Sequence, residues 1–341
     1  MWRAALLAVA AAVIVLLYFR WRETGFDWRQ FGGTLAHLHF GWLVAAAALS
    51  LASYYGRALR WAEMIRPYKP EPNVGNLFTA TAIGFCVVTL LGRPGELVRP
   101  YLIAVKERVT FSSQVAIWVL ERIFDLLSSL LIFGFALSRL DPAMIELNAK
   151  FGWVLKTGGN VVAVVCAVCI GILLFFRHFS VVARERILEA LAFLPAHQHR
   201  RADELVTAFS QGLEATRKGS VLSRILGYTV LEWALIVGCY FCLVWSFPGL
   251  SGLRPTDVLI LLGFVAFGSL VQIPGVGGGV QLVTIVVLTE LYGVGLEEAT
   301  GVAVAVWILT FVVIVPFGLL LGLREGMNWK RIREIEEKAA I

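Results

Sequence analysis

Six long apolar runs constrain the fold of this chain more than any other feature of its sequence. Each is near the ~20 residues that an α-helix needs to cross about 30 Å of hydrocarbon. Because the runs are continuous rather than alternating, they predict helices and not a transmembrane barrel. With 58% hydrophobic residues, the chain is predicted to be an all-α, polytopic membrane protein. The six runs are Trp2–Phe19, Gly41–Ala58, Ser113–Leu137, Val154–Phe176, Ile225–Phe247 and Thr300–Leu323.

The first run stands where a signal peptide would. It has no small-residue cleavage site and is followed by Arg20, Trp21 and Arg22, so we expect it to be retained as a span. Basic residues then predict the orientation of the whole chain, because they gather in cytoplasmic loops. We therefore expect a multi-pass protein of the cytoplasmic (inner) membrane, with both termini in the cytoplasm. The basic segments are Arg57–Lys69, Lys106–Arg108, Arg177–Arg224 and Arg324–Lys338.

Two further apolar stretches are short and interrupted. Leu77–Leu91 breaks at a Gly-Arg-Pro-Gly-Glu sequence before Val98–Val105, and Val258–Ile273 breaks at Pro274–Gly279 before Leu282–Leu291. The charge pattern places both ends of each stretch on one side of the membrane. We therefore predict about six full spans plus two re-entrant hairpins in an inverted repeat, an arrangement typical of transporters. The alternative is that every short segment crosses, which gives up to ten spans.

We expect a single transmembrane domain over residues 1–341. Its parts are a first span and outer segment (1–40), a first half-repeat (41–137), a connecting span with a cytoplasmic amphipathic segment (138–224), a second half-repeat (225–323) and a cytoplasmic tail (324–341). Apolar residues recur near helical spacing within the connecting segment, which favours amphipathic helices on the inner leaflet. A solvated helical linker is the alternative.

Charged residues inside this apolar chain are the main candidates for function. Each charge near the centre of a span costs roughly 2.5–3.5 kcal/mol on insertion scales. Helical spacing after Pro94 would bring Glu96 and Arg99 together, and Gly92 and Gly95 permit a tight turn. Such a helix start with arginines suits a lipid phosphate, although a structural ion-pair network is the alternative. The central set is Arg93, Glu96, Arg99, Glu121, Arg122 and Asp125.

Further candidates are weaker. Arg57 and Arg60 end a span, where interfacial anchoring competes with head-group binding. Glu96, Glu121 and Glu232 are candidates for proton coupling. The broken second hairpin could free polar backbone at depth. Its candidate binding residues are Gln272, Pro274, Gly275, Gly277, Gly278, Gly279 and Gln281.

Signatures of catalysis and of cofactor binding are missing from the sequence. There is no HExxH, Walker A or GxSxG motif. The CxxC pairs Cys166/Cys169 and Cys239/Cys242 lie in apolar segments without polar company, so we expect buried small residues rather than a metal or redox site. We expect no cofactor, no metal and no nucleic-acid partner.

Four motifs in this order resemble the lysylphosphatidylglycerol synthase transmembrane-region family, also called flippase-like. They are Arg57-Ala-Leu-Arg-Trp61, Gly92-Arg-Pro-Gly-Glu-Leu-Val-Arg-Pro100, Glu121-Arg-Ile-Phe-Asp125 and Pro274-Gly-Val-Gly-Gly-Gly279. The resemblance implies the lipid-translocating part without the aminoacyl-transferase domain. The family often has a glutamate after the glycine-rich break, where this chain has Gln281, which puts a mechanism with a charged group there in doubt.

The sequence thus predicts translocation of an anionic phospholipid or lipid-linked head group through a polar cavity between the hairpins. Membrane lipids with anionic head groups would be its partners, and a homo-oligomer or a partner from envelope synthesis is possible. One alternative is a non-catalytic membrane subunit of an envelope-lipid synthesis complex. The other is a membrane-embedded enzyme acting on lipid head groups. We expect a transporter rather than an enzyme.

Overall fold

The computed structural model describes residues 25–139, 195–215, 219–269, 272–273 and 277–326, with a few isolated positions between 164 and 189. The predicted spans Trp2–Phe19 and Val154–Phe176, the pair Cys166/Cys169, and Pro274 and Gly275 lie outside the continuous described ranges. The described chain is helical except for one pair of two-residue strands. It is therefore an α-helical membrane protein, as the apolar runs predict.

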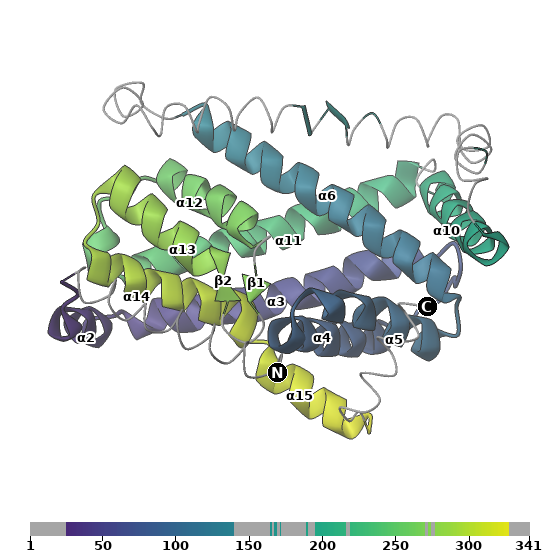
Figure 1. Ribbon diagram of the computed structural model, residues 1–341, viewed down its shortest axis with the longest axis horizontal. Helices are drawn as coiled ribbons and strands as arrows, with labels where there is room; N and C mark the ends of the chain where they lie inside the picture. The colour runs from purple at the N-terminus through teal and green to yellow at the C-terminus, as the bar shows by residue number, and fades with distance from the viewer. Residues whose placement is uncertain are drawn as a thin grey trace, which may run out of the picture.

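Long helices run the length of the molecule (Figure 1). They are α3 (Phe40–Ile65), α6 (Phe111–Leu137), α11 (Gly219–Ser246) and a last span that consists of α14 (Leu296–Trp307), the π-helical η4 (Ile308–Val312) and α15 (Val315–Arg324). By length and apolarity, α11, the last span and α4 (Val74–Leu91) qualify as membrane spans within the described residues. The short α2 (Trp28–Ala36) and α3 qualify together as a pair bent by 80°.

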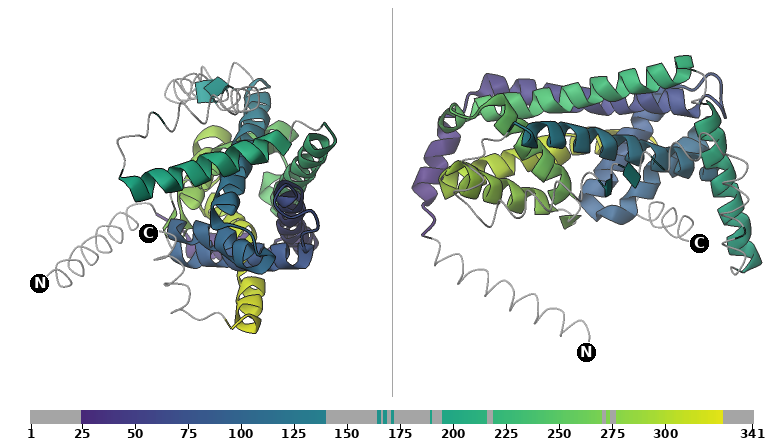
Figure 2. Two further views of the ribbon diagram at one scale, coloured as in Figure 1. Left: turned by 90° about the vertical axis from the view of Figure 1, so that its right-hand side faces the viewer. Right: turned by 90° about the horizontal axis from the view of Figure 1, so that it is seen from above.

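Helices α3 and α11 lie antiparallel along one another, as the view from above in Figure 2 shows. Trp42 near the start of α3 meets Trp245 at the end of α11, with ring centroids 5.0 Å apart. Further along, a Cβ on Gly56 would stand 3.9 Å from Glu232. Because each helix opens one half of the chain, this pair joins the two halves.

The first short apolar stretch forms a hairpin. Helix α4 ends at Gly92, which has φ +79°, a conformation that favours glycine. The turn η1 (Arg93–Leu97) and α5 (Val98–Glu107) follow, and α5 packs back along α4. The start and end of the hairpin meet, since Asn76 Nδ2 donates to Glu107 Oε1 at 2.8 Å. Helix α4 has 18 residues, which is more than the predicted stretch of about 15. The hairpin is therefore defined by α5 packing back along α4, and not by a short α4.

The second short stretch also forms a hairpin. Helix α12 (Pro255–Gly268) is followed by the antiparallel strands β1 (Gln272–Ile273) and β2 (Gly277–Gly278), then α13 (Gly279–Val286) and the π-helical η3 (Val287–Leu291). A Cβ on Gly268 would stand only 2.7 Å from Gly279 O, so the two arms need a glycine where they meet. Tyr292 Oη donates to Asp257 O at 3.5 Å, which joins the two ends.

Packing between these elements is reciprocal. The hairpin helix α4 of the first half packs against α15 of the second, while α12 of the second half packs against α6 of the first. Likewise, α5 packs against α6, and α13 against α14. Exchange of the two halves therefore preserves the pattern, as an inverted repeat requires.

Ion pairs between separate elements gather at one end of the molecule. Lys69, Lys106 and Arg224 pair with Glu107, Glu325 and Glu63 at one end. Helix α10 (Ala196–Ala215), the described part of the predicted amphipathic segment, packs against α6 and lies at this end (Figure 2). The opposite end holds the acidic start of α14, where Glu297 accepts a hydrogen bond from Asp27 N.

Candidate functional site

A cluster of buried and partly buried charges lies where the first hairpin meets α3, α6 and α11. Four arginines and three carboxylates belong to it. Residues three or four apart share one face of a helix, so α3 presents two arginines together and α6 presents two carboxylates together. The members are Arg57 and Arg60 from α3, Arg99 from α5, Glu121, Arg122 and Asp125 from α6, and Glu232 from α11.

Glu121 is the centre of this cluster, and its side chain is completely buried. One carboxylate oxygen faces all four guanidinium groups. This arrangement holds arginines from three helices around one point, because each guanidinium is attracted to the same anion. Glu121 Oε1 lies 2.7 Å from Arg122 Nη2, 2.9 Å from Arg99 Nη1, 3.5 Å from Arg60 Nη2 and 3.8 Å from Arg57 Nη1.

The other two carboxylates bind the same arginines from further sides. Asp125 Oδ1 lies 2.7 Å from Arg60 Nη2. Glu232, which is also completely buried, lies 3.0 Å from Arg57 Nη2 and 3.2 Å from Arg60 Nη1. Since Glu232 belongs to α11, these pairs tie the second half to the first.

The cluster carries more positive than negative charge. Four arginines against three carboxylates leave a formal charge of 4 − 3 = +1. Glu96 lines the cavity beside the cluster, but within the described residues it forms no ion pair. Glu96 and Arg99 both line the cavity, but among the described residues no ion pair joins them, and Arg99 pairs with Glu121 instead.

Arg99 is held by close packing. A Cβ on Gly84 would stand 2.6 Å from Arg99 Cβ, so only glycine lets α5 approach α4 here. The guanidinium stacks 4.1 Å from the ring of Trp61, whose Nε1 donates to Gln114 Oε1 at 3.0 Å. Although Arg99 is only 4% exposed, its Nε and Nη2 have no hydrogen-bond partner. It therefore has donor capacity left for an anion.

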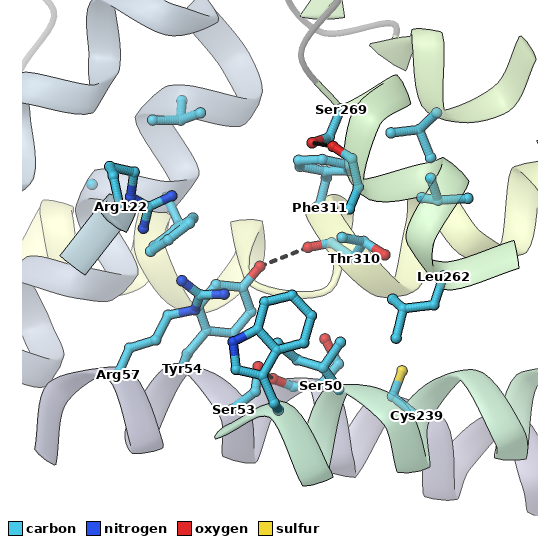
Figure 3. A pocket seen from close by; sticks show the side chains of 18 of the residues that line it. Ser50, Ser53, Tyr54, Arg57, Arg122, Cys239, Leu262, Ser269, Thr310 and Phe311 are labelled. Atoms are coloured by element: carbon cyan, nitrogen blue, oxygen red, sulfur yellow. Dashed lines mark hydrogen bonds between the residues drawn. The ribbon is translucent and has the colours of Figure 1, made fainter. Parts of the chain in front are cut away.

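A cavity of about 270 Å³ opens beside the cluster. Arg57, Glu96, Arg99 and Arg122 line it from the first half, whereas Arg60, Glu121, Asp125 and Glu232 stand behind this layer. Figure 3 shows Arg57 and Arg122 on one side, and Leu262 and Cys239 on the other. The cavity thus has a cationic wall from the first half and a largely apolar wall from the second. From the second half come Trp233, Ile236, Cys239, Tyr240, Leu262, Val265, Ala266, Ser269, Val280, Thr310 and Phe311.

Interfacial anchoring by Arg57 and Arg60 is contradicted by the structure. Helix α3 continues to Ile65, beyond the predicted end of the span, and Arg60 is completely buried. The carboxylates of α6 and α11 hold both guanidiniums inside the protein, so the arginines do not reach toward an interface.

Of the remaining central residues, Arg93 begins η1, with Pro94 in the first turn as predicted.

The glycine-rich break of the second hairpin has a structural role in the described residues. Gln281 Oε1 accepts a hydrogen bond of 2.6 Å from Gly278 N and so caps the start of α13. Gln272 pairs with Gly278, and Ile273 with Gly277, along the two strands. The cavity is lined by Ser269 and Val280, which lie beside this break. It is not lined by the predicted binding residues Gln272, Gly277, Gly278, Gly279 and Gln281.

Sequence reasoning missed the polar residues that follow Arg57 toward the start of α3. Ser50, Ser53 and Tyr54 line the cavity on the same helix face. The sequence could have indicated them, because positions 50, 53, 54 and 57 follow the i, i+3, i+4, i+7 pattern of one helix face. Among the described residues, no group of three His, Cys, Asp or Glu could hold a metal ion.

Comparison with protein families decides the relationship of this chain. The family model described as "Lysylphosphatidylglycerol synthase TM region" matches residues 5–318, which is most of the 341 residues. The chain belongs to this family. The match covers both halves and the charge cluster, and it connects this lysylphosphatidylglycerol synthase transmembrane-region protein with membrane lipids. Searches of curated proteins and of solved structures gave no match.

Proposed function

We propose that this protein translocates an anionic phospholipid or lipid-linked head group across the cytoplasmic membrane. The head group would occupy the cavity while the acyl tails stay in lipid. The observation that carries the proposal is the cationic wall, in which a buried Arg99 keeps two unpartnered nitrogens beside a cluster of net positive charge. Arginine donors in a water-poor site bind phosphate strongly and with defined geometry.

The arginines are preorganised before any substrate arrives. Glu121 draws four guanidiniums around one oxygen, so a phosphate would meet donors that already converge. The arginines that line the cavity would contact the phosphate, and the carboxylates behind them would hold their positions. Of the three candidates for proton exchange, Glu96 lines the cavity, whereas Glu121 and Glu232 are completely buried.

Two further features support movement through the membrane. The hairpins α4–α5 and α12–α13 approach the cavity from opposite halves, and broken helices at matching positions of inverted repeats surround the central sites of transporters. In the proposal both hairpins are re-entrant, and the end with α10, which holds Lys69, Lys106 and Arg224, faces the cytoplasm. A second copy of the chain or an envelope-synthesis protein would be an accessory partner.

The test is movement of acyl-labelled phosphatidylglycerol between the leaflets of proteoliposomes. We expect wild-type protein to accelerate it and Arg99→Gln to reduce the rate at least tenfold, because the variant loses charge-assisted bonds worth about 1.5–3 kcal/mol each. Arg66→Gln is the control, since Arg66 pairs with Glu63 at 3.2 Å and does not line the cavity.

The outcomes separate the proposal from its rivals. Equal rates for wild type and a folded Arg99→Gln variant would remove the cationic wall from the mechanism. Chemical analysis of the lipids afterwards must recover them unaltered, because a new lipid species would indicate an enzyme. A lack of movement that is restored by a co-purified protein would indicate a subunit of a larger complex.

A further inference from the structure

The face of α3 that lines the cavity changes its chemistry along its length. Arg57 stands at one end of this face, and Ser50, Ser53 and Tyr54 follow toward the start of the helix (Figure 3). The three hydroxyl residues are at most 7% exposed. Buried hydroxyls in a membrane protein must have hydrogen-bond partners, so the direction of their bonds decides what they can offer a ligand.

Each of these hydroxyl protons is already used within the protein. Ser50 Oγ donates to Leu309 O at 2.5 Å, Ser53 Oγ to Ser50 O at 2.7 Å, and Tyr54 Oη to Thr310 O at 2.6 Å. A fourth cavity hydroxyl, Ser269 Oγ, donates to Ala266 O at 2.6 Å. A hydroxyl has one proton and two lone pairs. With these bonds in place, the four oxygens have no proton left to donate and can accept further hydrogen bonds.

The opposite holds at the cationic wall. Arginine is a donor without acceptor capacity, and Arg57, Arg99 and Arg122 supply this wall. The cavity also contains the indole of Trp233, whose buried Nε1 has no hydrogen-bond partner. The cavity therefore has a donor side formed by guanidiniums and, along α3, an acceptor side formed by the hydroxyl oxygens of Ser50, Ser53 and Tyr54. The carboxylate of Glu96 is a further acceptor.

From this polarity we propose that the cavity selects phosphodiester lipids whose head group carries its own O–H or N–H donors. The inference rests on the proposed function and names the substrate class of that site. The phosphate would lie against the arginines, and the hydroxyl or amine of the substituent would donate to the oxygens of Ser50, Ser53 and Tyr54. A head group without donors would leave these buried acceptors without a partner, which costs affinity.

The size of the cavity agrees with a small head group. Its volume of about 270 Å³ is close to the lower end of the roughly 300–1,000 Å³ range of small-molecule pockets. This space suits a phosphate with a substituent such as glycerol or ethanolamine, but not the acyl chains.

Two pairs of acyl-labelled lipids test the inference in proteoliposomes. Phosphatidylglycerol and phosphatidylmethanol have the same charge, but only the first has hydroxyl donors. Phosphatidylethanolamine and phosphatidylcholine are both zwitterionic, but only the first has N–H donors. We expect wild-type protein to move the donor-bearing member of each pair about three- to tenfold faster, which corresponds to one or two hydrogen bonds.

Ser53→Ala assigns the preference to the cavity. The Oγ of Ser53 bonds only within its own helix, so the change removes an acceptor without breaking a contact between helices. Ser246→Ala is the matched control, because Ser246 is buried, bonds Leu243 O within α11 in the same way and does not line the cavity. We expect Ser53→Ala to lower the preference within both pairs and Ser246→Ala to leave it unchanged.

Other results would overturn the inference. Equal rates within each pair, together with a loss of phosphatidylglycerol movement in Arg99→Gln, would refute the selection while the proposed function stands. An equal fall in preference for Ser246→Ala and Ser53→Ala would show that the effect does not arise in the cavity. No movement of any lipid by folded wild-type protein would overturn the proposed function itself.

Discussion

The two hairpins turn back on themselves in the same way, but they offer different chemistry to the cavity. In the first hairpin, Arg99 and Glu96 face the cavity beside the charge cluster. In the second, Val265, Val280 and Ser269 do so. The difference follows from where each hairpin satisfies its polar groups. Among the described residues, the break of the second hairpin is closed by strand pairing and by the Gln281 cap.

The first hairpin satisfies its charge through other helices. Arg99 needs Glu121 of α6, and the arginines around it need Glu232 of α11. A buried charge whose partner is removed is strongly destabilising, whereas a locally satisfied hydroxyl is not. The comparison shows that equivalent hairpins of a repeat can have different roles. The first hairpin supplies charged side chains to the cavity, and the second supplies a largely apolar wall. The following changes test this division.

The largest effect is expected for Glu121→Gln. The variant leaves four arginines against two carboxylates in a buried cluster, so we expect the free energy of unfolding to fall by about 3–5 kcal/mol. In the second hairpin, the fully buried Thr284 bonds Val280 O within its own helix, and Thr284→Val should cost about 1 kcal/mol or less. Thermal and denaturant unfolding in detergent would measure both. Similar losses for the two variants would contradict the division.

A smaller effect is expected from glycines that let the hairpin arms approach. A Cβ would stand 2.6 Å from Arg99 Cβ in Gly84→Ala and 2.7 Å from Gly279 O in Gly268→Ala. Both variants should therefore lose about 1–3 kcal/mol of stability by overpacking. Only Gly84→Ala moves an arginine of the cationic wall, so only this variant should slow lipid movement beyond what its lowered stability explains. Equal slowing in both would show that the hairpins contribute alike.

The smallest effect is expected at the base of the first hairpin, outside the apolar spans. Burial alone would raise the pKa of Glu107, but hydrogen bonds from Lys69, Asn76 and the backbone of Asn73 lower it. Glu107 therefore stabilises the fold fully above the ordinary glutamate pKa of about 4.3, and this contribution is lost as the pH falls through its lowered value. Glu107→Gln should lower the free energy of unfolding by about 1 kcal/mol at pH 7. It should also reduce the loss of stability that wild type shows as the pH falls below the ordinary glutamate pKa. The same loss of stability at acid pH in Glu107→Gln and in wild type would contradict this role of Glu107.

Much of the fold could be predicted from the sequence, because apolar runs and basic loops report directly on helices and on their ends. Gly92 and the Pro274–Gly279 segment marked the two hairpins, and the spacing of Glu121 and Asp125 placed them on one helix face. The six central charges were assigned to one site, but the sequence did not show which arginine pairs with which carboxylate, such as Arg99 with Glu121. Pairing between helices depends on packing, which the spacing along one helix does not report.

The same limit explains the error for Arg60 and the omission of Ser53. Arginines near the predicted end of a span have the pattern of an interfacial anchor, and only the carboxylates of other helices show that Arg60 is buried. The spacing of Ser53 from Arg57 places both on one helix face, but this face alone does not indicate a cavity. Its place beside a cavity depends on α4, α11 and the last span, which come from distant parts of the chain.

Binding of an anionic lipid by the cationic wall is the central claim, and thermal unfolding in mixed micelles measures it most directly. Wild type and Arg99→Gln would each be unfolded with phosphatidylglycerol and with phosphatidylcholine. Since a ligand stabilises the state that binds it, we predict that phosphatidylglycerol raises the Tm of wild type by about 5 °C over phosphatidylcholine. Arg99→Gln should lose most of this difference. The same difference in both proteins would contradict a phosphate site at Arg99.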